Sequence, residues 1–179
     1  MLHHLTLIST GGTLEKEYIE SDGEVKNFRS KVGSYLSRLR LPYLHIIHQE
    51  LMNMDSLFMK EEHREKILGA VKEFQEKSDS IVVTHGTDTM TISGEYLKAR
   101  LTPKVAIVFT GAMAPLGFEN SDALQNLTEA LLASQILPPG FYLAFHGHVF
   151  EMGQVRKNRD KSCFEPIASP ESPTPEKTK

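Results

Sequence analysis

The chain has 179 residues, 40% of them hydrophobic, which is enough to build the core of one globular domain. Its formal net charge of −3 argues against the basic face with which a protein binds nucleic acid. The single cysteine, Cys163, excludes an internal disulfide and implies no oxidising compartment.

The amino-terminal segment reads as a strand and not as a targeting signal. Residues 1–8 lack a cationic start, and the chain reaches polar Ser9 and Thr10 too soon for a signal peptide. No apolar run approaches the roughly 18 residues that a membrane span requires. We therefore expect a cytoplasmic protein without membrane contact.

Strand-like and helix-like segments alternate along the chain, and residues 15–28 between them are polar and predict an irregular lid or connector. Apolar runs predict strands at residues 5–8, 44–51, 80–84, 105–109 and 141–146. Helical spacing predicts helices at residues 29–39, 60–77, 88–100 and 121–135. This order favours the α/β class, as a three-layer α/β/α domain with a mostly parallel sheet. We expect it to cover residues 1–167, with a disordered tail rich in Pro, Ser, Glu and Lys over 168–179.

Two threonine–glycine segments carry most of the functional information. Thr10-Gly11-Gly12-Thr13 follows the first strand, and His85-Gly86-Thr87-Asp88-Thr89 follows the third. Ligands bind in the crevice at the carboxyl ends of parallel strands, so both segments are expected to face one small molecule. A threonine hydroxyl becomes a nucleophile when a neighbouring group takes its proton. Two threonines beside a carboxylate therefore favour acyl transfer over redox or phosphate chemistry.

Each of these residues also has a simpler reading. Gly11-Gly12 could form a plain turn or a phosphate cradle, although no complete phosphate-binding motif follows it. Asp88 could cap the helix predicted after it, Asp55-Ser56 could be a turn, and Lys157 could be a solvated charge. An unrelated nucleotide-binding domain of flavodoxin-like shape is a further alternative.

The eight histidines raise the question of a metal site. His146 and His148 would share one face of a strand, and His45 and His48 are also close in sequence. No carboxylate or cysteine completes a ligand set at zinc-like spacing, so no metal is expected. His85 is expected to orient the threonine turn. Cys163 lacks the surroundings of a nucleophile.

Thr10-Gly11-Gly12-Thr13-Leu14 resembles the amino-terminal signature of the bacterial-type L-asparaginases, and residues 83–90 resemble their second signature. The similarity continues through Thr110–Met113. It reappears at residues 148–157, which look like the family's hairpin carrying a catalytic lysine. The resemblance covers roughly residues 4–165 and implies the fold of the family's amino-terminal domain, while the smaller carboxy-terminal domain has no counterpart in this sequence.

The resemblance implies roles for particular residues. It makes Thr13 and Thr87 catalytic, with Lys157, hydrogen-bonded to Thr87, and Asp88 as the proton relay. It also places a tyrosine, here Tyr18, on a loop over the nucleophile. It assigns Asp55 and Ser56 to the substrate's α-carboxylate, Asp88 also to its ammonium, and the Ala112 carbonyl to its amide. Backbone N–H groups near Gly12, Gly86 and Thr87 would contact the substrate and its oxyanion.

Two functions follow as hypotheses. The first is an asparaginase-like amidohydrolase without cofactor, which releases ammonia from L-asparagine or a related small ω-amide. The alternative is a catalytically weak or inactive module that binds a small molecule or regulates. We also expect a two-fold homodimer, because the last predicted helix carries Leu132 and Ile136 in addition to Leu124, Leu127 and Leu131, which are expected to point inward.

Overall fold

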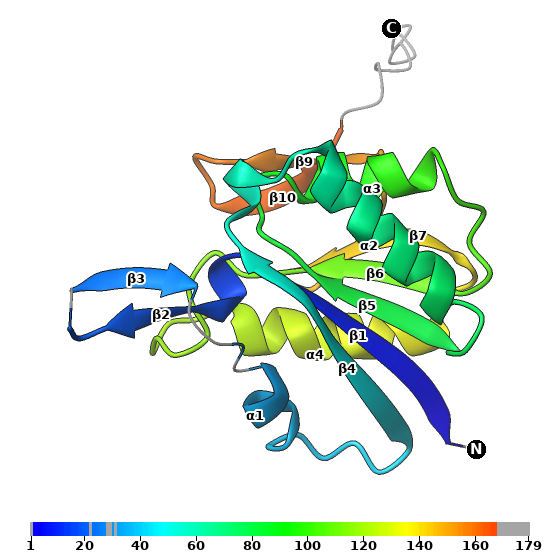
Figure 1. Cartoon of the computed structure of the whole chain (residues 1–179), viewed down its shortest axis with the longest axis horizontal. Helices are drawn as coiled ribbons and strands as arrows, with labels where there is room; N and C mark the ends of the chain where they lie inside the picture. Colours follow the sequence, from blue (N-terminus) through cyan, green and yellow to red (C-terminus); the bar gives the residue numbers. More distant parts are fainter. Residues whose placement is uncertain (1, 22, 28–29, 31, 168–179) are drawn as a thin grey trace, which may run out of the picture.

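A six-stranded sheet in the order β4-β1-β5-β6-β7-β8 forms the centre of the protein (Figure 1). The computed structural model describes residues 2–21, 23–27, 30 and 32–167, so the predicted tail lies outside the described residues. The strands are β1 (His3–Gly11), β4 (Leu44–Met54), β5 (Ser80–Thr84), β6 (Ala106–Thr110), β7 (Gly140–Phe145) and β8 (His148–Glu151). The first five run parallel, and β8 is antiparallel to β7. The prediction of a mostly parallel sheet is confirmed.

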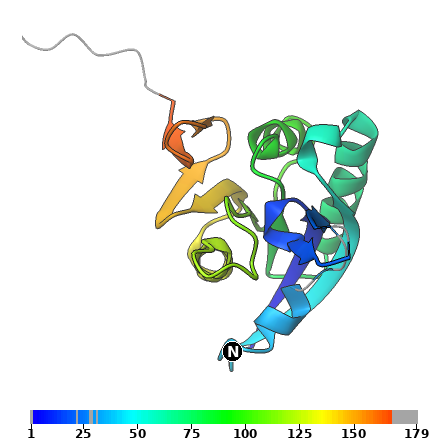
Figure 2. The same ribbon diagram turned by 90° about the vertical axis from the view of Figure 1, so that its left-hand side faces the viewer.

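Helices cover both faces of this sheet, which confirms the three-layer arrangement (Figures 1 and 2). One face is covered by α2 and α3, the other by α4 with the short α1. Their bounds are α1 (Val32–Leu36), α2 (Glu61–Phe74), α3 (Met90–Lys98) and α4 (Ala123–Ile136). Within the described part of the chain, no helix has the length and apolar character needed to cross a membrane.

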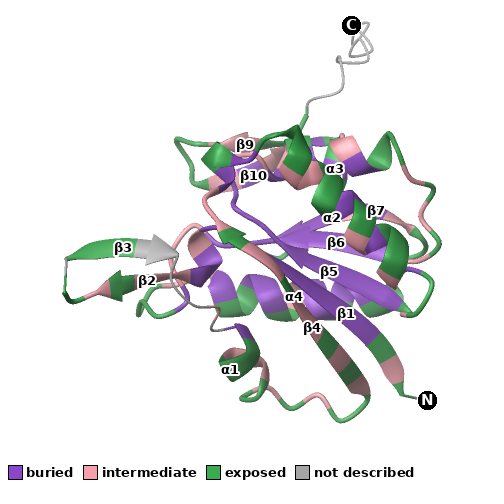
Figure 3. Ribbon diagram, in the orientation of Figure 1, coloured by how far each residue is buried: buried purple, intermediate pink, exposed green. Residues whose placement is uncertain are grey.

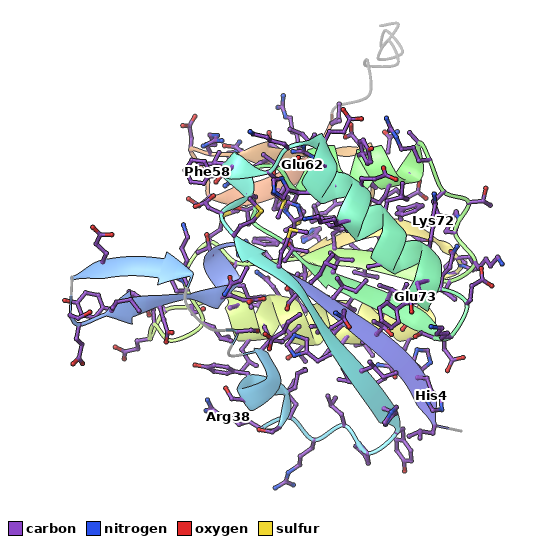
Figure 4. All side chains as sticks on the ribbon, in the orientation of Figure 1. His4, Arg38, Phe58, Glu62, Lys72 and Glu73 are labelled. Atoms are coloured by element: carbon purple, nitrogen blue, oxygen red, sulfur yellow. The ribbon has the colours of Figure 1, made fainter. Side chains whose placement is uncertain are left out.

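The central strands are apolar on both sides because both sides are buried (Figure 3). In β5, Ile81 and Val83 pack with α2 and α3, whereas Val82 between them packs with α4. The helix α2 is instead apolar on one side only, through Ile67, Leu68 and Val71. Its exposed side carries charged residues, among them Glu62, Lys72 and Glu73 (Figure 4).

The prediction of an irregular loop over residues 15–28 is wrong for most of its length. A β-hairpin forms there from β2 (Lys16–Ile19) and β3 (Glu24–Asn27) and projects from the body of the protein (Figure 1). Four-residue strands are too short to show a hydrophobic alternation. The sequence Asp22-Gly23, a strong hairpin signal, was the available clue.

The prediction that residues 148–157 form a hairpin with each other is also wrong. The strand β8 pairs with β7 in the main sheet, and the lysine lies on β9 (Val155–Asn158), which pairs with β10 (Cys163–Pro166). Lys157 is thus carried by a hairpin formed with residues further along the chain.

The inward face predicted for α4 needs one correction. Leu127 and Leu131 are fully buried as expected, but Leu124 is 37% exposed. Leu124 lies on the side of the helix that also carries the exposed Thr128 and Leu132, whereas its neighbour Ala123 is fully buried.

Candidate active site

The two threonine–glycine segments touch at the carboxyl ends of β1 and β5. Gly12 has a φ of 77°, and a Cβ added to it would lie 2.4 Å from the Cα of Gly86. Only glycine combines this left-handed backbone with so close an approach. Thr13, which opens a single 3-10 turn η1 (Thr13–Glu15), and Thr87 each follow one of these two glycines. The fold therefore brings the loops of both motifs together.

A third segment, at the end of β4, joins them. Ser56 begins the 3-10 turn η2 (Ser56–Phe58), and a Cβ on Gly86 would lie 2.4 Å from the Ser56 hydroxyl oxygen. Asp55 caps this turn by accepting the N–H of Leu57 at 3.0 Å. The turn reading of Asp55-Ser56 is thus correct, and the turn directs a serine to the site. The exposed Phe58 marks its outer side in Figure 4.

The hydroxyl group of Ser56 is buried in this site without a hydrogen-bond partner among the described residues. Ser56 is 1% exposed. Its carbonyl accepts a hydrogen bond from the Thr89 hydroxyl at 3.0 Å, which fixes the turn against the second motif. A buried hydroxyl without a partner costs free energy, and a bound acceptor would recover it.

Lys157 reaches this junction from the β9–β10 hairpin. Its Nζ donates to Thr87 Oγ1 at 2.7 Å and to Asp88 Oδ1 at 3.1 Å. The predicted contact between Lys157 and Thr87 is confirmed, and the reading of a solvated charge is wrong, since this side chain is only 17% exposed. The capping alternative for Asp88 finds no support, because α3 begins after Thr89 with no side-chain capping bond.

Two further cations lie at the site, and the sequence reading missed both. Arg159 places Nη2 2.8 Å from Asp88 Oδ1, and Lys16 places Nζ 2.7 Å from Asp55 Oδ2. Both belong to hairpins whose charged residues resemble ordinary surface residues, so the sequence offered no signal. Burial raises the pKa of Asp55, but hydrogen bonds, chiefly that from Lys16, and the charge of Lys157 outweigh it and hold the pKa below its ordinary value.

The loop with Ala112 is held from behind by side chains on α4 and the β7–β8 turn. Asp122 accepts the N–H groups of Met113 and Ala114 at 3.0 Å, and His146 Nε2 lies 2.9 Å from it. The buried Asn126 donates to the Gly111 carbonyl at 3.0 Å. This network anchors the loop in which the resemblance places a substrate-binding carbonyl.

His85 supports the second motif from the inside. It is fully buried, and its Nδ1 donates to the Gly86 carbonyl at 2.8 Å. Burial lowers its pKa to about 4, so the ring is neutral at pH 7. These contacts agree with the expectation that His85 orients the threonine turn.

Glu15 is a buried acid beside the first motif that sequence reasoning also missed. It is 3% exposed, and the Thr84 hydroxyl lies 3.4 Å from its Oε1. Burial raises the pKa of Glu15 to about 7, with the charge of Glu50 adding to the rise and nearby hydroxyl groups opposing it. A glutamate in a polar stretch predicts a surface residue, which is why the burial of Glu15 was missed.

Tyr18 and the backbone of Gly12 are two further groups of the predicted site. Tyr18 lies on β2, is 56% exposed, and lines a pocket of about 280 Å³ shared with Leu14 and Phe118. The N–H of Gly12 donates to the Met54 carbonyl at 2.9 Å, so this group is not available to an oxyanion.

The histidine pairs considered for a metal have other partners. His146 bonds to Asp122, His48 Nε2 lies 3.0 Å from the Ser9 hydroxyl, and the ring of His45 packs edge-on against that of His4. Across the described ranges, no group of three or more His, Cys, Asp or Glu could hold a metal ion.

Comparison with known proteins places this fold and site in one class. Residues 4–177 match the family described as "Asparaginase, N-terminal", and the chain belongs to that family. It is similar to the L-asparaginase of Thermococcus kodakarensis, with 32% identity over 86% of this chain and 47% of that protein. The solved structure of the thermostable enzyme from the same organism superimposes with a TM-score of 0.83 at 29% identity, covering 93% of this chain and 52% of that one.

The relatives differ in what their names say they act on. One of the subunits of the glutamyl-tRNA(Gln) amidotransferase of Methanococcus vannielii is 28% identical over 83% of this chain and 35% of its own length. The chain spans about half or less of the length of these relatives. Family membership therefore fixes the kind of domain, and the substrate has to be argued from the site.

Proposed function

We propose that this domain is an asparaginase-like amidohydrolase that uses a threonine nucleophile on the side-chain amide of L-asparagine or a related small ω-amide. The observation that carries the proposal is the contact of Lys157 Nζ with both Thr87 and Asp88, beside the loop that bears Thr13. An amine within hydrogen-bond distance of a hydroxyl and a carboxylate is a suitable proton relay.

The proposed reaction proceeds through an acyl-enzyme. The hydroxyl of Thr13 attacks the amide carbon, its proton passes to the relay, and ammonia leaves as the carbon–nitrogen bond breaks. Water then attacks the ester and releases the acid. Lys157 can take part once its amine has given a proton to Asp88 or to solvent. Thr87, bonded to Lys157, belongs to the same relay, and both threonines are assigned as catalytic.

Substrate binding in this proposal depends on polar groups that surround the two threonines. The unpartnered Ser56 hydroxyl can donate to a substrate carboxylate, and its burial makes that bond worth more than one in water. The loop held by Asp122 and Asn126 contains Ala112, which is fully buried in this structure and is the residue whose carbonyl is proposed to contact the amide. Asp88 is the carboxylate that would hold an ammonium group where a substrate carries one.

The test is ammonia release by the purified full chain from L-asparagine, L-glutamine and simple ω-amides. We expect release from at least one of them, with first-order dependence on protein concentration. No release from any, together with binding of the product acids, would favour the alternative of a non-catalytic binding module. Thr102→Ala, an exposed change before β6, serves as the control for preparation quality.

A further inference from the structure

Arg159 shares an oxygen of Asp88 with Lys157. Its Nη2 lies 2.8 Å from Asp88 Oδ1, and Lys157 Nζ lies 3.1 Å from the same atom. The Arg159 side chain is 69% exposed, so it can move without disturbing the core. A carboxylate flanked by two cations attracts a third cation less strongly than a free one.

The ion-paired side chains of the site have an excess of positive charge. Lys16, Lys157 and Arg159 are three cations, and Asp55 and Asp88 are two carboxylates, which leaves a net charge of +1 as long as the proton of the Lys157 amine stays on Lys157 or Asp88. The orphaned Ser56 hydroxyl adds a neutral donor. L-Asparagine is a zwitterion, whereas its deaminated counterpart keeps the carboxylate and carries a net charge of −1. The anion is the better electrostatic match.

We infer that Arg159 sets the substrate class of this site, in favour of dicarboxylic acid monoamides that carry a carboxylate but no α-ammonium group. The inference rests on the proposed amidohydrolase function. A substrate ammonium at Asp88 would lie close to the guanidinium, and like charges within about 4–6 Å disfavour each other. A substrate with an uncharged carbon in place of the ammonium group is not repelled by the Arg159 guanidinium.

The chemistry of such a substrate is the same hydrolysis. The amide carbon–nitrogen bond breaks and ammonia leaves with the proton passed on by the relay. Water supplies the hydroxyl group that completes the second carboxyl. Succinamate with water thus gives succinate and ammonia, and no further reactant is required.

The first experiment compares kcat/KM for succinamate and L-asparagine in three proteins. Wild type is expected to process succinamate at least as well as L-asparagine. Arg159→Gln should lower the succinamate-to-asparagine ratio about fivefold, the size of effect expected for an exposed ion pair. Arg159→Lys keeps the charge and should keep most of the preference.

Arg156→Gln is the matched control. Arg156 lies on the same hairpin, is similarly exposed, and bonds to Glu165 on β10 at 2.9 Å and not to the site. It removes the same charge and should leave the ratio unchanged. A wild-type ratio below one, or an equal shift in the Arg156 and Arg159 variants, overturns the inference.

A second experiment measures binding without catalysis. Calorimetric titration with succinate and with L-aspartate compares the deaminated and aminated product acids. Succinate is expected to bind more tightly to wild type, and Arg159→Gln should narrow the difference about fivefold. If no amide releases ammonia, the proposed function fails, and this binding comparison alone decides the inference. Equal or absent binding of the two acids overturns it.

Discussion

The site is built from two regions that differ in how firmly they are held. The ends of the parallel strands β1 and β5 are buried and in backbone contact, as the 2.4 Å approach at Gly12 and Gly86 shows, and the buried Ser56 joins them from the turn after β4. The hairpin β9–β10 is anchored by the buried Val155 and Phe164, but its charged Arg156 and Arg159 are largely exposed. The first region supplies the hydroxyl groups and the carboxylates Asp55 and Asp88, and the second supplies cations.

This difference predicts how substitutions will behave. Hydroxyl groups fixed by a packed core can be positioned to fractions of an ångström, which nucleophilic chemistry requires. Exposed charges are held by interactions worth about 1 kcal/mol or less, so they adjust affinity and preference. Changes in the strand ends should therefore have large effects on rate and stability, and changes in the hairpin small ones.

The largest effect is expected from the threonines. Thr13→Ala and Thr87→Val should each lower kcat for ammonia release by at least about a thousandfold, because each removes a group that acts at the reacting atoms. The unfolding midpoint should change little for Thr13→Ala. Turnover equal to wild type in both variants would show that the activity belongs to another site or to a contaminant.

The backbone contact can be broken by a single methyl group. Gly12→Ala should destabilise the protein by about 3 kcal/mol, since its Cβ has no space and its φ of 77° is unfavourable for alanine. Gly69→Ala is the matched control, because nothing lies within 4 Å of its added Cβ on α2. It should stabilise the protein by about 0.5–1 kcal/mol. Urea unfolding of both variants measures the contrast.

A third prediction concerns the buried acid beneath the first motif. Because the pKa of Glu15 rises from 4.5 to about 7 on folding, the folded protein keeps a proton that the unfolded chain gives up between these values. This group therefore lowers the free energy of unfolding as pH rises from about 4.5 to about 7, by about 3 kcal/mol. Glu15→Gln removes that loss, so its advantage over wild type should grow across this range and level off above it.

Urea unfolding at several pH values gives the measurement. The pKa of His85 is lowered on folding from 6.5 to about 4, so its own contribution rises with pH over much of the same range. It is present in both proteins and cancels in their difference. Glu20→Gln on the exposed hairpin removes an equal charge as a control. A difference between wild type and Glu15→Gln that is constant with pH would contradict the prediction.

The main strands and helices were predictable from the sequence because buried positions leave a pattern of apolar residues. Strands buried on both sides are continuous apolar runs, and α2 repeats its apolar residues at helical spacing. The hairpins β2–β3 and β9–β10 were not recognised as they form, because four-residue strands with polar faces leave no such pattern. The pairing of β8 with β7 was also missed, although the two strands are joined by the two-residue turn His146-Gly147, whose φ values of 50° and 77° are typical of a tight hairpin.

The candidate site was likewise predictable in part. The two loops were predictable as neighbours because parallel strands end at one edge. The contact of Lys157 with Thr87 spans 70 positions and was predicted from family resemblance alone. Arg159 and Lys16 were missed, since an exposed cation on a hairpin looks the same in sequence whether or not it faces a carboxylate.

The smallest expected effect lies on the outside of the sheet, away from the threonines. Leu132 and Ile136 on α4 are 60% and 73% exposed, and a pocket of about 190 Å³ is lined by both of them and by Val149 on the edge strand β8. Exposed apolar patches next to an open sheet edge commonly mark association sites, and a two-fold dimer is the commonest form. We expect a homodimer through this surface, measured by light scattering at micromolar concentration. The double change Leu132→Glu and Ile136→Glu should give monomers with unchanged ammonia release, whereas Leu124→Glu should leave the mass as it is. A strictly monomeric wild type would contradict this prediction. It would mean that the surface formed by Leu132, Ile136 and Val149 stays exposed to solvent in the isolated chain.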